Sequence, residues 1–195
     1  MVVVLGSLFL SLVLFAGVGL ANHAAKQLDI CCAWNGILSD GVLTYKISGG
    51  DAVAHATVRG AVEDWESVAG LTLTQVFGTG ADISVKFKTG GGMIAGQALR
   101  KFDRQGFISS VNLTISGSGF GLRNSQATIA EITRHEMGHA LGLGHANFDD
   151  LMDPTVGGSS LISSCDREGV RQANHWKLAD GAATPHQPHV THIGC

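Results

Sequence analysis

Three histidines stand at a spacing that can place their side chains around one metal ion. They belong to the segment HEMGHALGLGH, in which His135 and His139 are one helical turn apart, so both imidazoles leave the same face of a helix. Gly142 can adopt a positive φ angle, which ends the helix and turns the chain back so that His145 can supply a third ligand. Three neutral nitrogen ligands leave a fourth position for water, as in a catalytic zinc site. Zinc is the expected metal, although copper, nickel and iron accept the same ligands.

Glu136, which follows the first of these histidines, is a candidate general base. It can reach a water on the metal without binding the metal itself. The extended motif fixes five residues, and its chance occurrence in a short chain is about one in ten thousand. The alternative is a helix whose exposed histidines bind nothing. Because glycine stands where the turn requires it, the sequence predicts a catalytic zinc centre.

Together with Met152, this motif resembles that of the metzincin zinc peptidases. Met152 lies in the sequence DDLMDP, at the distance after the third histidine that suits the Met-turn beneath the metal. Among metzincins the chain is most similar to the matrixins, over about residues 34 to 178. Besides the motif and the Met-turn, this similarity rests on Trp34-Asn35-Gly36, Ala61-Val62-Glu63-Asp64-Trp65 and Ala81-Asp82-Ile83.

The resemblance implies a zinc-dependent endopeptidase that hydrolyses peptide bonds in extended protein substrates. His135, His139 and His145 would hold one catalytic zinc ion, and Glu136 would be the general base for a metal-activated water. Met152 would form the Met-turn. The implied fold is α+β, with a twisted mixed sheet of about five strands, three helices, and the Met-turn after the active-site helix.

The resemblance also implies where a substrate would bind. An extended peptide or protein segment would add a strand to the sheet edge at residues 93–99. We expect the protein to act as a monomer. The residues expected to contact the substrate are Ile94, Ala95, Gly96, Asp153, Pro154 and Thr155.

The sequence departs from the matrixin pattern before the active-site helix. Matrixins usually carry a second, structural zinc held there by histidines and an aspartate, yet no histidine occurs between His55 and His135. Acidic residues are also few in the preceding stretch, chiefly Asp82 and Asp103, which disfavours calcium sites. We therefore expect one catalytic zinc ion, without the family's structural zinc or calcium.

The periodicity of apolar residues predicts the elements that position this site. Asp51 can cap a helix in which Val58, Val62 and Trp65 form an apolar stripe, and Gly70 ends it. A long helix begins near Ser125 and carries the motif. Strands are predicted at 42–47, 71–77, 83–87, 93–99 and 111–115, and a final helix at 166–178. Strands followed by helices indicate an α+β domain.

The composition indicates a globular domain, and the N-terminal segment predicts that it lies outside the cytosol. Of the 195 residues, 45% are hydrophobic and 15% are charged, and the net charge of −3 offers no basic face for nucleic acid. Met1 to Leu20 is an uncharged apolar run typical of a signal peptide, with cleavage expected after Ala21. The run is also long enough to be an uncleaved membrane anchor. The expected divisions are a signal at 1–21, a short segment at 22–33, the catalytic domain at 34–180 and a tail at 181–195.

Four cysteines in the exported part predict disulfide bonds. Because adjacent cysteines rarely pair with each other, we expect Cys31 and Cys32 to bond to Cys165 and Cys195, with free cysteines as the alternative.

The C-terminal tail carries further potential metal ligands, each three residues from the next: His186, His189, His192 and Cys195. A second metal site is one interpretation. Pro185 and Pro188 oppose a helix that would align the four side chains. A flexible polar tail held by Cys195 is the favoured interpretation.

Two other functions are compatible with the same motif. The domain could bind zinc and a partner at a surface without catalysis, although a pure binding site has no need of Glu136. It could also hydrolyse a non-peptide amide or a cell-wall crosslink with the same centre.

Overall fold

A mixed five-stranded sheet is the centre of the computed structural model, which describes residues 25–88, 94–119, 122–123, 125–155, 159 and 161–195. Its strand order is β3-β2-β4-β6-β5. The first four run parallel to one another, and β5 runs antiparallel to β6 at one edge. The five strands are β2 (Val42–Ser48), β3 (Thr72–Gln75), β4 (Ile83–Lys88), β5 (Gly96–Phe102) and β6 (Ile108–Ser116). The prediction of a mixed sheet of about five strands is confirmed.

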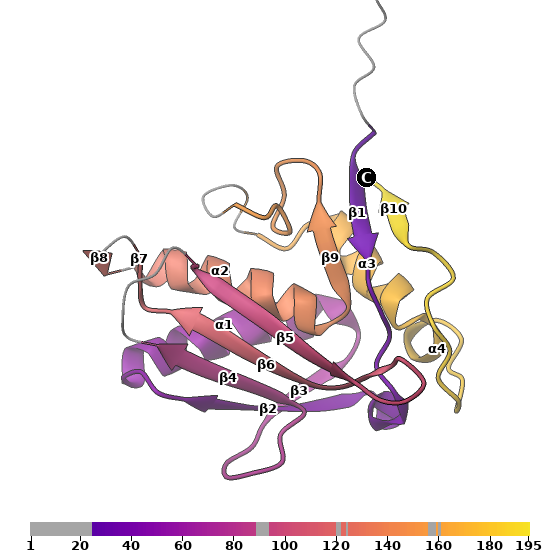
Figure 1. Ribbon diagram of the computed structural model, residues 1–195, viewed down its shortest axis with the longest axis horizontal. Coiled ribbons are helices and arrows are strands. Elements are labelled where there is room, and N and C mark those ends of the chain that lie inside the picture. The colour runs from indigo at the N-terminus through magenta and orange to yellow at the C-terminus, as the bar shows by residue number, and fades with distance from the viewer. Residues whose placement is uncertain (1–24, 89–93, 120–121, 124, 156–158, 160) are drawn as a thin grey trace, which may run out of the picture.

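Helices α1 (Ala52–Ala69) and α2 (Gln126–Ala140) lie side by side on one face of this sheet (Figure 1). The Asp51 side chain caps α1 by accepting from the Ala54 amide at 2.9 Å, and Gly70 ends that helix with φ 71°. The apolar stripe of α1 is fully buried and includes Trp65, whose indole nitrogen donates to the Arg134 carbonyl oxygen of α2 at 2.8 Å. These contacts hold the active-site helix against the core.

The strands predicted at 71–77 and 111–115 are β3 and β6, with shifted ends, and two other predicted elements differ more from the structure. The edge strand begins at Gly96 and continues to Phe102, and Met93 lies outside the described residues. The single helix expected at 166–178 is divided into α3 (Ser164–Ala173) and α4 (His175–Leu178). Asn174 lies at the break because its buried side chain bonds to distant backbone: its oxygen accepts from Trp34 N at 3.0 Å, and its nitrogen donates to the Leu141 carbonyl at 2.8 Å.

A second, three-stranded sheet joins both ends of the described chain. Strand β1 (Gln27–Ile30) lies between β9 (Leu143–Ala146) and β10 (His192–Gly194) and is antiparallel to both. Figure 1 shows these strands beside α3. The segments 22–33 and 181–195, expected to flank the domain, therefore each contribute a strand that packs against it. The remaining elements are η1 (Gly36–Asp40), β7 (Ser118–Gly119) and β8 (Leu122–Arg123).

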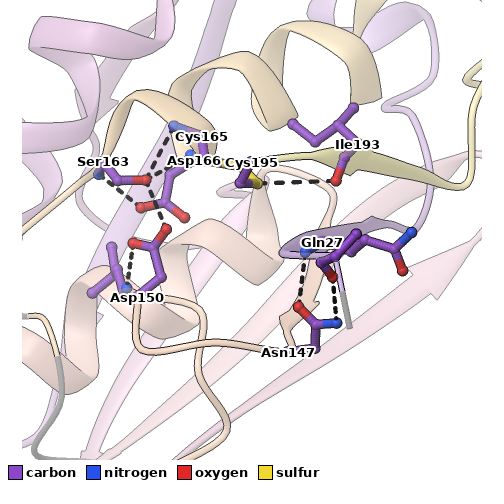
Figure 2. The surroundings of a disulfide bond; sticks show 10 residues. Gln27, Asn147, Asp150, Ser163, Cys165, Asp166, Ile193 and Cys195 are labelled. Atoms are coloured by element: carbon purple, nitrogen blue, oxygen red, sulfur yellow. Dashed lines mark hydrogen bonds between the residues drawn. A yellow bond between two sulfur atoms is a disulfide. The ribbon is translucent and has the colours of Figure 1, made fainter. Parts of the chain in front are cut away.

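The cysteine pairing differs from the expected one. Cys31 is bonded to Cys32, and Cys165 is bonded to Cys195 (Figure 2), so the predicted cross-pairing is wrong. Cys165 lies in the first turn of α3, beside the end of β10, with 5.7 Å between its Cα atom and that of Cys195. The N- and C-terminal segments are connected by strand pairing instead.

Within the described part of the chain, no helix is long and apolar enough to span a membrane. The apolar run at residues 1–20, interpreted as a signal peptide or anchor, lies outside the described residues.

Candidate active site

The three histidines of the motif converge at the end of α2. His135 and His139 project from α2, and His145 comes from β9. Their ring centroids are 4.7 Å (135–139), 4.8 Å (139–145) and 5.5 Å (135–145) apart. One ligand atom from each lies within 4.8 Å of the others, so a single ion can contact all three.

The turn at Gly142 brings His145 to the other two histidines. Gly142 has φ 104°, a conformation that L-residues with side chains rarely adopt. A Cβ atom here would collide with the carbonyl oxygen of Cys32 and lie 2.8 Å from the Ala173 side chain. Strand β9 starts at the next residue and pairs with β1, and Cys31 N donates to the Gly142 carbonyl at 2.9 Å. Strand β1 and Cys31, which precede the predicted catalytic domain, thus hold the strand that carries His145 in place.

Backbone carbonyl groups orient two of the three imidazoles. His135 Nδ1 lies 2.7 Å from the Leu151 carbonyl oxygen, and His139 Nδ1 lies 3.0 Å from that of Leu143. Since a carbonyl oxygen only accepts, each Nδ1 must carry the proton, which leaves each Nε2 with a free lone pair for a metal. Burial lowers the pKa of His135 and lowers that of His139 to about 3, so both rings are neutral at pH 7.

Arg100 is a site residue that the motif did not reveal. It extends from β5, where its Nε donates to the His139 carbonyl at 2.7 Å and its Nη2 to the Leu143 carbonyl at 2.5 Å. These carbonyls belong to the end of α2 and the start of β9; the first also accepts from Gly142 N at 3.2 Å and the second lies 3.0 Å from His139 Nδ1, so Arg100 is a charged second partner for each. The two-residue period of a strand was the signal available in the sequence, because it places Arg100 on the same face as Gly96.

Met152, the residue predicted to form the Met-turn, packs against the active-site helix. It is fully buried, and a Cβ atom at Gly138 would lie 2.5 Å from its sulfur. Gly138 precedes His139, so the thioether packs against the helix between the two ligands of α2. The Met152 carbonyl also accepts from Ala146 N at 2.8 Å, which connects the turn to β9.

Glu136 is buried next to the histidine cluster. Its Oε2 atom has no hydrogen-bond partner among the described residues, and a Cβ atom at Gly96 would collide with Oε1. Burial raises the pKa of Glu136 to about 7, and the nearby Arg100 charge opposes that rise. The carboxyl group therefore lies against the backbone of the edge strand, where only a glycine leaves room for it.

A cleft of about 490 Å³ opens beside Glu136 and His135. Its lining comes from the start of β5 and the residues just before it, from α2, and from the residues on both sides of Met152. All six residues expected to contact substrate line it: Ile94, Ala95, Gly96, Asp153, Pro154 and Thr155. Ile132, Leu151 and Ser159 lie in the same cleft.

The donor set fits zinc. His135 and His139, with Nδ1 bonded to carbonyl groups, offer Nε2, and His145 supplies a third imidazole, so three nitrogen ligands leave one open coordination position, which is the pattern of catalytic zinc. An unpartnered, buried carboxylate oxygen beside that position is costly unless a ligand or water satisfies it.

This fold and site define a zinc-dependent metallopeptidase of the metzincin kind. Comparison with family models places residues 38–174 in the matrixin family of peptidases, designated M10. The chain belongs to that family. The matched range includes the sheet, the histidine motif and the Met-turn, but neither β1 nor β10. A comparison with curated proteins returns no match.

Proposed function

We propose that this protein is a secreted zinc endopeptidase that cleaves extended segments of other proteins. The observation that carries the proposal is the placement of Glu136, whose buried and unpartnered carboxylate oxygen lies beside three convergent histidines and faces a cleft. A zinc-binding recognition module would gain nothing from this carboxylate, and its burial is unfavourable.

Each group of the site has a role in peptide hydrolysis. Zinc bound by His135, His139 and His145 would supply a Lewis acid for the scissile carbonyl and lower the pKa of a water molecule. Glu136 accepts the proton of the attacking water and passes it to the leaving amine. Its raised pKa suits both steps, because a group that titrates near neutral pH can accept and release a proton. Arg100 holds the end of α2 in place while this occurs.

Strand β5 is the proposed binding edge for the substrate backbone. It pairs only with β6 in the described sheet, so its outer side is open to an extended peptide. Gly96 of this strand lies against the Glu136 side chain, which places a peptide aligned on β5 next to the base. The side chain that follows the cleaved bond would enter the cleft between Ala95 and Pro154.

The test compares the full chain with its Glu136→Gln variant for bound zinc and for cleavage of casein. Loss of a general base reduces turnover by about 100-fold to 10,000-fold, while the zinc content should stay at the wild-type level. Glu63→Gln, on the exposed face of α1, is the matched control and should cleave normally. Mass spectrometry of the products identifies the new termini.

The alternative functions give different results in the same assay. A recognition module would bind zinc and cleave nothing in any variant. A hydrolase of non-peptide amides would leave casein intact and act on an amide or crosslinked cell-wall substrate in a Glu136-dependent way. Either result would contradict the endopeptidase proposal.

Export from the cytosol is part of the proposal. It is supported by the uncharged apolar run at residues 1–20 and by four cysteines in two bonded pairs. Expression of the full chain in a secreting host, followed by N-terminal sequencing of the extracellular product, should give a terminus after Ala21. Retention of the whole chain in the membrane fraction would instead identify an anchor.

A further inference from the structure

A second cluster of metal-ligating side chains lies outside the active site, between α4 and β10. It contains His175 at the start of α4, Asp180 just after that helix, and His186 and His189 in the following segment. One ligand atom from each of these four side chains lies within 4.8 Å of the others. The ring centroids of His186 and His189 are 4.7 Å apart, and those of His175 and His189 are 5.6 Å apart.

We propose that these four residues bind one zinc ion as a closed structural site. Three imidazoles and one carboxylate give four protein ligands, and a tetrahedral zinc with four protein ligands has no open position for catalysis. With bonds of 2.0–2.1 Å, the ligand atoms of such a site would be about 3.3 Å apart. His175 Nδ1 and His186 Nε2 each lie 3.0 Å from Asp180 Oδ2, which is close to that spacing.

The contacts of His186 are those expected of a metal-bound histidine. Its Nδ1 lies 3.2 Å from the Gln187 carbonyl oxygen, and its Nε2 lies 3.0 Å from Asp180 Oδ2. Both partners are acceptors, so either a protonated imidazole donates from both nitrogens or a cation stands between Nε2 and the carboxylate. A cation between Nε2 and the carboxylate would bind both and leave Nδ1–H to the carbonyl group, which is the usual arrangement of a metal-bound histidine.

The local fold explains why only part of the tail contributes to this cluster. Gly181, with φ 61°, turns the chain after α4, and Ala182 N donates to the Trp176 carbonyl at 2.7 Å. The segment then passes back along α4 and brings His186 and His189 to it. His192 belongs to β10, and Cys195 is bonded to Cys165, so neither joins the cluster. The ligand set considered from the sequence alone, which included those two residues, is therefore wrong.

The role of such a site would be to fasten the segment between α4 and β10. That segment leads directly into β10, which pairs with β1, and β1 pairs with the strand that carries His145. The ion would thus stabilise the sheet behind the third catalytic ligand without taking part in catalysis. Metals that bind the folded chain and not the unfolded one raise its stability.

The experiment measures zinc per chain in the full-length protein by elemental analysis after equilibration with buffered zinc. We expect two ions in the wild type, one in His186→Ala/His189→Ala, one in His135→Ala/His139→Ala, and none in the fourfold variant. Added zinc should raise the melting temperature of His135→Ala/His139→Ala but not that of the fourfold variant. His192→Ala, in the same tail, is the matched control and should still bind two ions.

Equal zinc content in the wild type and in His186→Ala/His189→Ala would overturn the proposal, and so would a zinc-free His135→Ala/His139→Ala chain with a native circular dichroism spectrum. Asp180→Asn provides a second variant, since it removes the anionic ligand and leaves all three histidines. It should lose the tail-site zinc without affecting the active-site ion. Because each site is counted separately, failure at the tail site is distinguishable from failure of the catalytic centre.

Discussion

The turn at Gly142 is the feature of the active site on which a single substitution should act most sharply. In Gly142→Ala, the new methyl group would meet the Cys32 carbonyl oxygen and lie 2.8 Å from the Ala173 side chain. The backbone would also have to hold alanine at φ 104°. Relief of either conflict moves the start of β9, and with it His145.

A matched control separates two parts of the lost unfolding free energy: the backbone strain and the crowding by the new methyl group. Gly70→Ala also places alanine at a positive φ after a helix, at 71°, but nothing lies within 4 Å of the new methyl group. That variant reports the backbone cost alone, about 1–2 kcal/mol. Overpacking in a filled region adds about 1–3 kcal/mol, so Gly142→Ala should lose about 2–5 kcal/mol of unfolding free energy.

Two measurements separate the stability effect from the metal effect. Denaturant unfolding in the presence of a chelator gives the free energies of the metal-free variants. Competition with a chromogenic chelator gives the zinc affinity of the active site, measured in a His186→Ala/His189→Ala background so that the proposed tail site does not contribute. Displacement of the third ligand should weaken zinc binding roughly 10- to 100-fold in Gly142→Ala, the range seen when ligand orientation is disturbed, and should leave Gly70→Ala unchanged.

This reasoning would be refuted if Gly142→Ala kept the wild-type zinc affinity and had the same stability as Gly70→Ala. That result would mean that β9 can reach the metal without the left-handed turn. A loss of stability with unchanged zinc affinity would show that the crowding is real but that His145 is positioned by its pairing with β1 alone.

Three further predictions concern groups around the metal. Gly96→Ala should push Glu136 aside and lower kcat roughly 100-fold with zinc retained, as measured on casein; normal turnover would show that the two do not touch. Arg100→Gln should lower both the melting temperature and zinc affinity, because two carbonyl groups lose a charged donor; unchanged calorimetry and chelator competition would contradict this. Burial raises the pKa of Asp166 from 3.8 to about 7, and the Asp150 charge adds to the rise. The unfolding free energy of the wild type should therefore fall as the pH rises from 4 to 7, by up to about 1.4 kcal/mol per pKa unit. Asp166→Asn should not show that fall, and parallel stability profiles for the two proteins would indicate that Asp166 is ionised when folded.

The position of Asp166 explains why it should titrate in this way. It lies in the first turn of α3, where Ser163 N donates to its Oδ2 at 2.8 Å, and it is fully buried. Ser163 Oγ also donates to Asp150 Oδ2 at 3.0 Å, so two carboxyl groups share one capping serine (Figure 2). Asp150 precedes Leu151, whose carbonyl orients His135, and the network thus extends from the capping serine to a metal ligand.

The sequence was sufficient to predict those parts of the structure that depend on local spacing. The pair His135 and His139 follows from the helical period, and α1 follows from its capping aspartate and its terminal glycine. Alternation predicted β4 almost to the residue. The Gly142 turn was also predictable, because a positive φ leaves little choice of residue.

The parts that could not be predicted all depend on contacts between distant segments. Strands β1 and β10 are short and separated by about 160 residues, so no periodicity shows that they pair. The same pairing brings Cys195 to Cys165 and removes it from any metal site. The tail histidines were visible, but their partner His175 lay within a helix predicted at 166–178, and nothing in the sequence showed that the chain turns back after α4 to bring His186 and His189 to His175 and Asp180.

Strand β5, at the edge of the sheet, contacts several parts of the active site. Its residues alternate between two faces, so Gly96 and Arg100 face α2 while Leu99 is exposed. Gly96 leaves room for the carboxyl group of Glu136, and Arg100, four residues later, binds the carbonyl of His139, three residues after Glu136. Strand β5 would therefore also set the position of a peptide paired with its outer edge relative to the base and the metal. A shift of β5 by one residue would move that peptide away from both.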